Sequence, residues 1–494
     1  MNTQQKEKYY IGIDLGTTHM KSAVFDEHGT LVEIVKDATP VTADEYGQIY
    51  RPEEFCGLIK GQLARLLKRH GNICAISITG MSEAGLIINR TTGKEATPII
   101  PWFDRRTVGL SNQVSKEQEQ EYLCRTGLRN NYKYGIYKYL WLLEHSGIKR
   151  EDSLWLSACD YIAWKLTGEF VTDPGFAART YVYDIINHCW DEERLAGYGL
   201  STYNFPKVLP SGERAGCLSD SGLLSYTGTK NIIVCIGGHD HVCAAYAVIR
   251  EDANHICNSI GTAETFLGIT DTVALTESNY HSGMVYGAYV NGKCNFWMGN
   301  ISSSGQSVEW FRKKAQRTPI DYPEMAELLA SLPKEPTGIL YFPYLSGIGT
   351  PRFQPEADGG FFGLRENHTA GDLLKAVIEG ISYQGKWILS LLPDEEIKKI
   401  RTITCVGGAA NSAPWMQIKA DILGIPVTVP DITEATLLGA VAVMLENNYG
   451  SQARERFLSE SKDKNQYYEV DYECNKKYQE VYQRFQFLAD KLLD

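Results

Sequence analysis

Three side chains that could do chemistry stand together in the stretch CIGGHDHVCAA, residues 235–245. His239, Asp240 and His241 follow two glycines, and imidazole and carboxylate groups are common metal ligands. In an extended strand, neighbouring side chains point to opposite faces, so Asp240 would point away from the two histidines. The spacing therefore disfavours a shared metal ion and favours histidines that line a pocket or pack in the core.

A second set of candidate residues lies in glycine-threonine turns that follow strand-like runs. IGIDLGTT at 11–18 has a counterpart in CNSIGTAET at 257–265, and a third strand-like run ends in Gly407-Gly408. Such turns present N–H groups and hydroxyls without bulk, which suits phosphate oxygens. A single turn of this kind is more often a plain hairpin, but two at matching positions favour a phosphate site. The residues concerned are Gly16, Thr17 and Thr18 in the first turn and Gly261 and Thr262 in the second.

The common nucleotide motifs are absent from the sequence. GTTHMKS at 16–22 imitates a P-loop, but Met20 stands where a glycine is required before Lys21. No G-x-G-x-x-G follows a strand, and no H-R-D kinase loop occurs. Any ATP site in this chain must therefore use a different cradle.

The elements around these residues alternate between strands and helices. Residues 9–32 read as strand, turn, strand, turn, strand, and 73–81 and 402–406 are further strands. Helical periodicity covers 62–70, 372–392, 412–424 and the tail from 467, which we expect to pack as a terminal helix. This pattern predicts an α/β fold. The repeated Gly-Thr turns suggest two halves facing a central cleft, with a boundary near 248–255.

Composition narrows the function class. The 494 residues are 43% hydrophobic and carry a formal net charge of -11, which argues against a general nucleic-acid surface and suits small-molecule work. The first ten residues lack the basic start and apolar middle of a signal peptide, and no apolar run is long enough to span a membrane. We therefore expect a cytoplasmic protein whose twelve scattered cysteines are reduced and mostly buried.

Seven motifs follow one another along the chain. They are GIDLGTT, PWFDRRT (101–107), DYIAWKLTGEF (160–170), GGHD (237–240), SIGTAE, GLRENHTAGDLLKAVIEGISY (363–383) and GGAANSAPWMQ (407–417). In this order they resemble the FGGY family of carbohydrate kinases, which includes glycerol kinases, xylulokinases, ribulokinases and gluconokinases, and the resemblance spans about residues 8–485. It implies two actin-like domains of the ribonuclease H type, with the sugar bound by residues 1–248 and ATP by residues 249–494.

The resemblance also implies a chemistry, which is transfer of the ATP γ-phosphoryl group to a substrate hydroxyl with Mg²⁺. Asp240, the aspartate of the GGxD motif, would be the catalytic base, and Asp14 and Asp240 would hold the metal. Phosphoryl transfer needs mainly positioning, charge neutralisation and one carboxylate near the nucleophile, which agrees with this assignment. The nucleotide would contact Gly16, Thr17, Thr18, Gly261, Thr262, Gly305, Gly407, Gly408 and Asn411.

The acceptor site is expected around residues 79–107. Glycerol kinases have Arg-Glu and xylulokinases Met-His where this chain has Ser82-Glu83. Glu83 keeps the hydroxyl-binding carboxylate of the first group, whereas Ser82 removes its cation. Trp102 and Asp104 would offer an aromatic face beside a carboxylate to a sugar, although a core position is common for a tryptophan. His241 would hydrogen-bond sugar hydroxyls.

Two neighbouring features have simpler interpretations. Arg105 and Arg106 are expected to be structural ion-pair partners, because the phosphate site is expected in the Gly-Thr turns. The segment NNYKYGIYKYL at 130–140 occupies a region that lines the substrate in the family. Its tyrosines and lysines could support a longer or anionic acceptor, or form a solvated helix.

The leading hypothesis is an ATP-dependent kinase of a small sugar, with a ketose such as xylulose as the first candidate because GGHD and PWFDRRT are closest to the ketose kinases. Ribulose, erythritol, glycerol and gluconate stay open as acceptors. An actin-like ATPase without kinase activity would need a peptide-binding or filament-forming region, and a silent sugar sensor is disfavoured by the retained Asp14 and Asp240. The expected partners are the sugar and ATP, without nucleic acid or membrane, and a homodimer is compatible with the resemblance.

Overall fold

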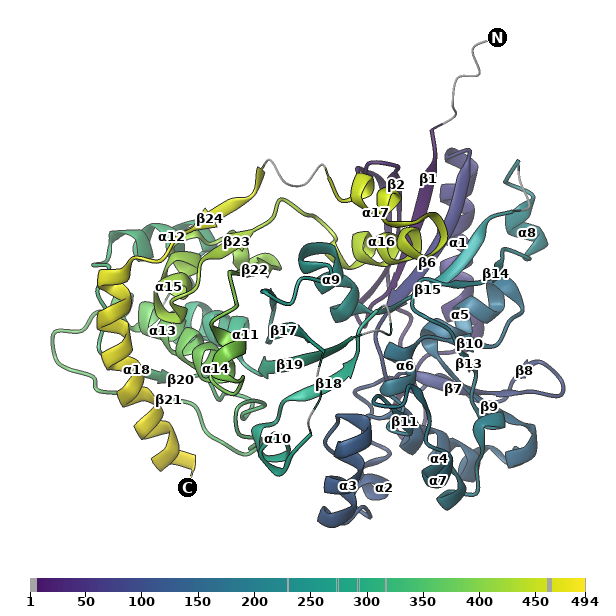
Figure 1. Cartoon of the computed structure of the whole chain (residues 1–494), viewed down its shortest axis with the longest axis horizontal. Coiled ribbons are helices and arrows are strands. Elements are labelled where there is room, and N and C mark those ends of the chain that lie inside the picture. Colours follow the sequence, from purple (N-terminus) through teal and green to yellow (C-terminus); the bar gives the residue numbers. More distant parts are fainter. Residues whose placement is uncertain are drawn as a thin grey trace, which may run out of the picture.

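The computed structural model describes residues 7–493 except 229–230, 272, 274, 291, 293, 316–317 and 460–463. Two sheet-based domains lie side by side, one built on β1, β2, β6 and β15 and the other on β17, β19 and β22 (Figure 1). Helices α9 and α16 lie between them (Figure 1). This confirms the predicted α/β class with two facing domains.

The first sheet has six strands in the order β14-β15-β6-β1-β2-β3. Strands β1, β2 and β3 form an antiparallel ribbon, while β6 and β15 run parallel to β1. The strand bounds are β1 Tyr9–Leu15, β2 His19–Asp26, β3 Leu31–Ala38, β6 Ile73–Gly80, β14 Arg214–Cys217 and β15 Ile233–His239.

The second sheet repeats this topology within seven strands, ordered β18-β19-β17-β16-β22-β23-β24. Strands β16, β17 and β19 form the antiparallel ribbon, and β22 and β23 continue parallel to β16. The sequence echo between the two Gly-Thr turns is therefore a structural repeat. The strand bounds are β16 His255–Ile260, β17 Glu264–Thr270, β18 Val285–Ala288, β19 Asn295–Ile301, β22 Thr402–Val406, β23 Val427–Val429 and β24 Gln466–Tyr468.

Helices and smaller strands complete the two domains. The longer helices are α1 Pro52–Arg69, α3 Lys116–Thr126, α4 Gly135–Ser146, α5 Ala158–Thr167, α9 Asp240–Ile249, α12 Tyr322–Ser331, α13 Ala370–Leu389, α15 Ala413–Leu423, α16 Ala435–Tyr449 and α18 Tyr472–Leu493. Shorter helices are α2 Val108–Ser111, α6 Pro174–Ala178, α7 Glu192–Gly197, α8 Ser221–Leu224, α10 Glu277–Ser282, α11 Ser304–Trp310, α14 Asp394–Ile397 and α17 Ser451–Phe457. Small sheets pair β7 Gly85–Asn89 with β8 Lys94–Glu95 and β9 Ser153–Ser157, β11 Tyr183–Asp184 with β12 Cys189–Trp190, and β20 Leu340–Phe342 with β21 Gly360–Phe362.

The predicted elements are present where the sequence placed them. Residues 62–70 fall largely within α1, 372–392 within and just beyond α13, and 412–424 around α15. The expected helix from residue 467 is wrong at its start, because 466–468 form β24 and α18 begins at Tyr472. Tyr478, Tyr482 and Phe485 of α18 pack in the core of the second domain, as expected. All twelve cysteines are free thiols, and most of them are buried. None of the helices in the described ranges has the length and apolar character to cross a membrane.

Helix α16 joins the two domains, because it comes late in the chain yet packs on the first sheet. Small residues of that sheet allow a close approach: a Cβ at Gly237 would lie 2.9 Å from the Ala440 Cβ. The Ser77 hydroxyl donates a 2.6 Å hydrogen bond to the Ala440 carbonyl. Nine consecutive residues of α16, 437–445, are buried. The C-terminal half of the chain therefore supplies part of the core that packs on the first sheet. A domain boundary at residue 248 does not describe this contribution.

Candidate active site

The carboxyl ends of three parallel strands bring the first group of predicted residues together. In the register of β1, β6 and β15, Asp14 lies opposite Thr79, and His239 lies opposite Gly80. The residues that leave these strands, Ser82-Glu83 and Asp240, therefore emerge at one edge of the sheet. This is the edge at which open α/β sheets bind ligands.

The equivalent edge of the second sheet gathers the predicted nucleotide residues. The Gly305 N–H donates to the Gly261 carbonyl at 3.1 Å, and the Gln306 N–H donates to the Thr262 carbonyl at 3.0 Å. Gly407 has a φ of 99°, a conformation that favours glycine, and a Cβ there would lie 2.4 Å from the Ile260 carbonyl oxygen. The turn after β16, the start of α11 and the loop after β22 thus form one group. Gly407, Gly408 and Asn411 in that loop are exposed.

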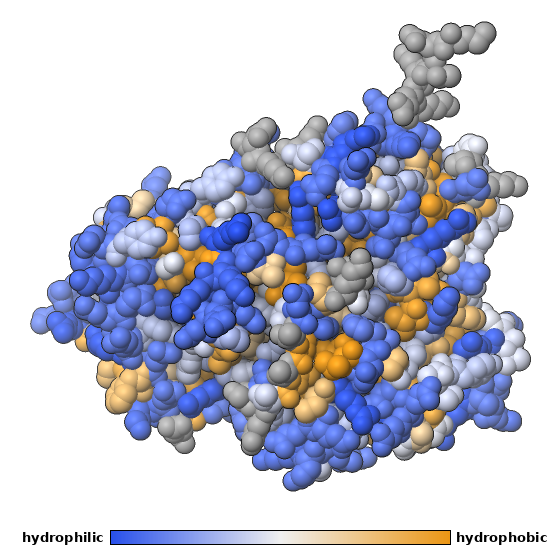
Figure 2. Space-filling view, in the orientation of Figure 1, coloured by the Kyte–Doolittle hydropathy of each residue, from blue (hydrophilic) through white to orange (hydrophobic). Residues whose placement is uncertain are grey.

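One cavity of about 530 Å³ is lined by residues from both domains. In the view of Figure 2, hydrophilic side chains cover most of the surface and hydrophobic ones gather toward the middle, where the domains meet. The cavity lining from the first half of the chain includes Thr17, Ser82, Glu83, Trp102, Lys133, Tyr134, Arg179, His239, Asp240 and His241. The second half contributes Ser259, Gly261, Ala263, Thr265, Met298 and Asn300, among others.

Asp240 begins helix α9 and is held by its neighbours. The His239 Nε2 lies 3.0 Å from the Asp240 Oδ1 and 3.1 Å from the Ser82 Oγ. Because the Ser82 hydroxyl donates its hydrogen to Glu83, the His239 Nε2–H must be the donor in both contacts. Burial opposes ionisation, but His241 and His239 hold the pKa of Asp240 well below its usual range. Asp240 is therefore an ionised acceptor at neutral pH.

The expectation that Asp240 points away from the histidines is wrong. It assumed a continuous strand, but β15 ends at His239 and the chain turns into α9 at Asp240. The turn places the His239 ring against the carboxylate and the His241 ring 5.4 Å from the His239 ring. Within the described ranges, no group of three or more His, Cys, Asp or Glu side chains could hold a metal ion.

Glu83 is fixed by a buried ion pair in an unusual backbone conformation. Its φ of 62° lies in the left-handed region that side chains rarely adopt. The Arg179 Nε donates to the Glu83 Oε1 at 2.8 Å, and the Arg179 Nη2 donates to the same oxygen. Burial alone would raise the pKa of Glu83, but Arg179, Lys133 and His239 hold it at about 2. Glu83 is therefore a charged group of the cavity wall. Its left-handed backbone conformation is strained, and strained backbone of this kind is concentrated at functional sites.

The cation that Ser82 does not provide comes from elsewhere in the fold. Arg179, directly after α6, is buried beside Glu83, although 96 residues separate the two in sequence. The Lys133 Nζ lies 3.8 Å from the Glu83 Oε1. The sequence predicts a Glu83 carboxylate that has lost its neighbouring cation. The contacts with Arg179 and Lys133 correct this expectation. Sequence reasoning missed Arg179 as a site residue, and the only signal for Lys133 was the basic, tyrosine-rich segment at 130–140.

Asp14, near the end of β1, is a second carboxylate close enough to Asp240 to be affected by its charge. Burial and the negative charge of Asp240 raise its pKa to about 7, and Lys21 acts in the opposite direction. The Lys21 Nζ is itself bound to Glu434 at 2.6 Å. Two carboxylates that repel each other fit Mg²⁺, which commonly binds one or two carboxylates together with substrate phosphates.

Trp102 and Asp104 have different environments. The Trp102 ring is 38% exposed and lines the cavity, and its Nε1–H donates to the Thr17 Oγ1 at 2.9 Å. Asp104 is buried outside the lining, and its Oδ1 accepts hydrogen bonds from the Arg106 backbone N–H and Nε. Arg106 also binds Asp44, which confirms its predicted role as a structural ion-pair partner. The structure therefore brings Trp102 to the cavity and leaves Asp104 behind it.

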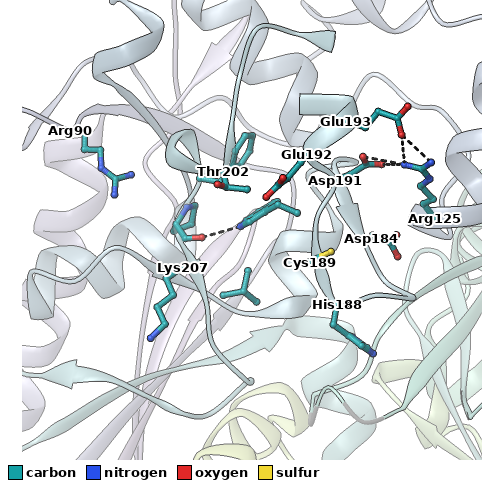
Figure 3. Close-up of a pocket in the computed structure, with 14 residues that line it drawn as sticks. Arg90, Arg125, Asp184, His188, Cys189, Asp191, Glu192, Glu193, Thr202 and Lys207 are labelled. Atoms are coloured by element: carbon teal, nitrogen blue, oxygen red, sulfur yellow. Dashed lines mark hydrogen bonds and ion pairs between the residues drawn. The ribbon is translucent and has the colours of Figure 1, made fainter. Parts of the chain in front are cut away.

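A wider depression of about 750 Å³ lies elsewhere, beside the β11–β12 hairpin (Figure 3). Its lining contains none of the predicted site residues. Arg125 is paired there with Asp191 at 3.2 Å and with Glu193 at 3.3 Å, so these charges are already satisfied (Figure 3). The cavity between the domains is the one that combines carboxylates with glycine turns.

Comparisons with known proteins agree with this architecture. The model for the N-terminal domain of the FGGY family of carbohydrate kinases matches residues 9–247, and that for the C-terminal domain matches residues 256–445. The chain therefore belongs to the FGGY family of carbohydrate kinases. It is an enzyme that transfers a phosphoryl group to an alcohol group.

The similar proteins are named as kinases of different acceptors. The glycerol kinase of Petrotoga mobilis is 29% identical over 449 residues, covering 88% of each chain. The ligand-bound xylulose kinase of Lactobacillus acidophilus superposes with a TM-score of 0.88 at 22% identity, covering 98% of each chain. The glycerol kinase of Plasmodium falciparum with ADP also gives 0.88 at 22% identity, covering 99% of each. The structural likenesses show a shared fold.

Proposed function

We propose that this enzyme transfers the γ-phosphoryl group of ATP to a hydroxyl of a small polyhydroxylated compound. The observation that carries this proposal is that Asp240 and Glu83 from the first domain and the Gly261 turn from the second line one cavity. A base, an acceptor-binding carboxylate and a phosphate cradle thus line one cavity.

Asp240 acts as the catalytic base. The acceptor oxygen forms a bond to the γ-phosphorus while the bond from that phosphorus to the β,γ-bridging oxygen breaks, which releases ADP. The hydroxyl proton passes to the Asp240 carboxylate and then to solvent. Because His239 fixes the carboxylate at 3.0 Å, the base is oriented before the substrate arrives, and phosphoryl transfer depends mainly on such positioning.

The nucleotide lies on the second domain, so residues 249–494 bind ATP and residues 1–248 the acceptor. The exposed turns with Gly261, Thr262, Gly407, Gly408 and Asn411 offer backbone donors there. Gly305 supports the Gly261 turn, since a Cβ on it would lie 2.3 Å from the Gly261 carbonyl oxygen. The ADP in the Plasmodium falciparum glycerol kinase supports a nucleotide donor.

Asp14 and Asp240 would hold Mg²⁺ on the phosphate side, beside Gly16, Thr17 and Thr18. When bound, the ion neutralises negative charge on the phosphoryl group. The raised pKa of Asp14 fits a carboxylate that awaits a cation. The Trp102 hydrogen bond to Thr17 links this turn to the acceptor wall.

Ser82, Glu83, Trp102 and His241 form the acceptor wall. Asp104 is left out of this set because it is buried outside the cavity lining. A ketose such as xylulose is the first neutral acceptor to test, followed by ribulose, erythritol and glycerol. ADP release from ATP and Mg²⁺ should rise strongly with at least one acceptor of the panel. Tight ATP binding with no acceptor-dependent turnover across the panel would count against the proposal.

A further inference from the structure

Two cations, Arg179 and Lys133, lie beside the Glu83 carboxylate at the cavity wall. Both Glu83 oxygens are in use, because Oε1 accepts from Arg179 and Oε2 from the Ser82 hydroxyl. The Lys133 Nζ is a third group near this carboxylate. It lies 3.8 Å from Oε1, and this distance is too long for a hydrogen bond. One carboxylate therefore faces two cations.

The Lys133 ammonium has an open hydrogen-bonding capacity. No group in the described part of the chain accepts a hydrogen bond from its Nζ, although the ammonium has three N–H donors. Its side chain is 32% exposed, and the residue lines the cavity between the domains. Its backbone is fixed, since its N–H donates to the Asn131 Oδ1 and its carbonyl accepts from the buried Lys138. The ammonium is therefore presented to the cavity by a constrained loop.

The neighbouring cation does not share this property. The Arg129 guanidinium also lines the cavity, but it pairs with Glu119 at 3.4 Å and lies over the rings of Tyr280 and Phe353 at 4.4 and 4.8 Å. Its charge is balanced within the protein. Among Arg129, Arg179 and Lys133, the charged group of Lys133 is therefore the one that donates no hydrogen bond within the described part of the chain.

We propose that Lys133 determines specificity by binding a carboxylate of the acceptor, so that the preferred substrate is a polyhydroxylated acid, not its neutral alcohol. This inference rests on the proposed kinase function and narrows its substrate class. The Lys133 ammonium donates no hydrogen bond within the described ranges, so it can give a charge-assisted hydrogen bond to a monoanionic carboxylate, whereas a phosphate dianion would be only half neutralised by it. The acid end of the acceptor contacts Lys133, and the reacting hydroxyl faces Asp240.

Matched pairs of acceptors test the proposal directly. Glycerate and glycerol, erythronate and erythritol, xylonate and xylitol, and gluconate and glucitol differ only by a carboxylate in place of a CH₂OH group. ADP release should show a higher kcat/KM for the acid of at least one pair, and titration calorimetry should show tighter binding of the same acid. Glycerol 3-phosphate tests the phosphate alternative, and a preference for it over every acid would overturn the carboxylate assignment.

Variants at Lys133 separate recognition from folding. Lys133→Met should lower kcat/KM for the preferred acid roughly 10- to 100-fold, the typical value of a charge-assisted hydrogen bond, with less than about a threefold effect on the neutral partner. Lys133→Arg should keep the acid preference. Lys149→Met, at an exposed lysine 4.0 Å from Glu151, is the control and should change neither.

Failure of the inference and failure of the proposed function give different results. Neutral acceptors that match or exceed their acids, or equal losses for both members of a pair in Lys133→Met, would overturn the role of Lys133 while the kinase activity stands. If no acceptor releases ADP, the kinase proposal fails. Calorimetry then still tests the inference through the binding affinities of the acids and their neutral partners. Tighter binding of an acid that disappears in Lys133→Met supports the role of Lys133. Equal binding of acids and neutral partners overturns it.

Discussion

The Glu83 carboxylate and the Arg179 guanidinium form a buried ion pair across 96 residues of sequence, with the Arg179 Nε 2.8 Å from the Glu83 Oε1. The pair holds Glu83 in its left-handed conformation at the cavity wall. It therefore connects the stability of the first domain with the geometry of the acceptor site.

Removal of one partner of this pair should cost more stability than removal of both. Glu83→Gln or Arg179→Met leaves one buried charge without its partner, a change that typically costs about 3–5 kcal/mol. The double variant leaves no such charge, so its Tm should lie above that of the less stable single variant. Differential scanning calorimetry of the three variants measures this. Additive losses in the double variant would show that the two side chains act independently.

Acceptor binding provides a second readout for the same variants. All three should raise KM for the acceptor with little change in KM for ATP, because Glu83 lines the first-domain wall of the cavity. A selective rise in KM for ATP would place the pair on the nucleotide side and contradict the assignment.

The two glycines after β22 should respond differently to alanine. Gly407→Ala introduces a Cβ 2.4 Å from the Ile260 carbonyl oxygen at a φ of 99°, which should cost about 1–3 kcal/mol and distort the nucleotide loop. Apart from its chain neighbours, no described residue has an atom within 4 Å of a Cβ at Gly408, so Gly408→Ala should keep the parental Tm. Thermal unfolding compares the two, and KM for ATP should rise in Gly407→Ala. Equal losses of Tm would contradict the loop geometry.

Features set by residues close together in sequence were predictable from the sequence, whereas features set by residues far apart in sequence were not. The ribbon of β1, β2 and β3 is local, and its alternating pattern and turn residues predicted it. The position of α16 was not predictable, because residues 437–445 are apolar on every side and such a pattern does not say which sheet the helix covers. The residues at strand ends were found through the motifs, whereas Arg179 was missed because its partner is distant in sequence and its own segment carries no sign of a site.

The buried Glu379 should make stability depend on pH. Burial raises its pKa to about 7 from an ordinary 4.5, while Lys375 at 3.8 Å acts in the opposite direction. Between these two values the native state binds more protons than the unfolded state, so this group's contribution to stability is lost as pH rises through 7. Glu379→Gln removes the titration, and its amide oxygen can accept from one of the Thr337 and Tyr478 hydroxyls while its NH2 group donates to the other.

The Tm of Glu379→Gln relative to the parent should therefore increase by several degrees between pH 5 and pH 8, since two pKa units correspond to about 3 kcal/mol. Thermal unfolding at the two pH values measures the change. Glu144→Gln, at an exposed position, is the control and should show a constant difference. A Tm gap for Glu379→Gln that does not vary with pH would show that Glu379 is ionised throughout.

The assignment of Asp240 as the catalytic base is the central claim, and acceptor-dependent ADP release by Asp240→Asn tests it most directly. The variant keeps the shape of the side chain but cannot accept the proton, so kcat should fall roughly 10²- to 10⁴-fold, while calorimetry without Mg²⁺ should show that ATP still binds to the second domain. Asp394→Asn, at an exposed position, is the control. Turnover by Asp240→Asn at the parental rate would contradict the account.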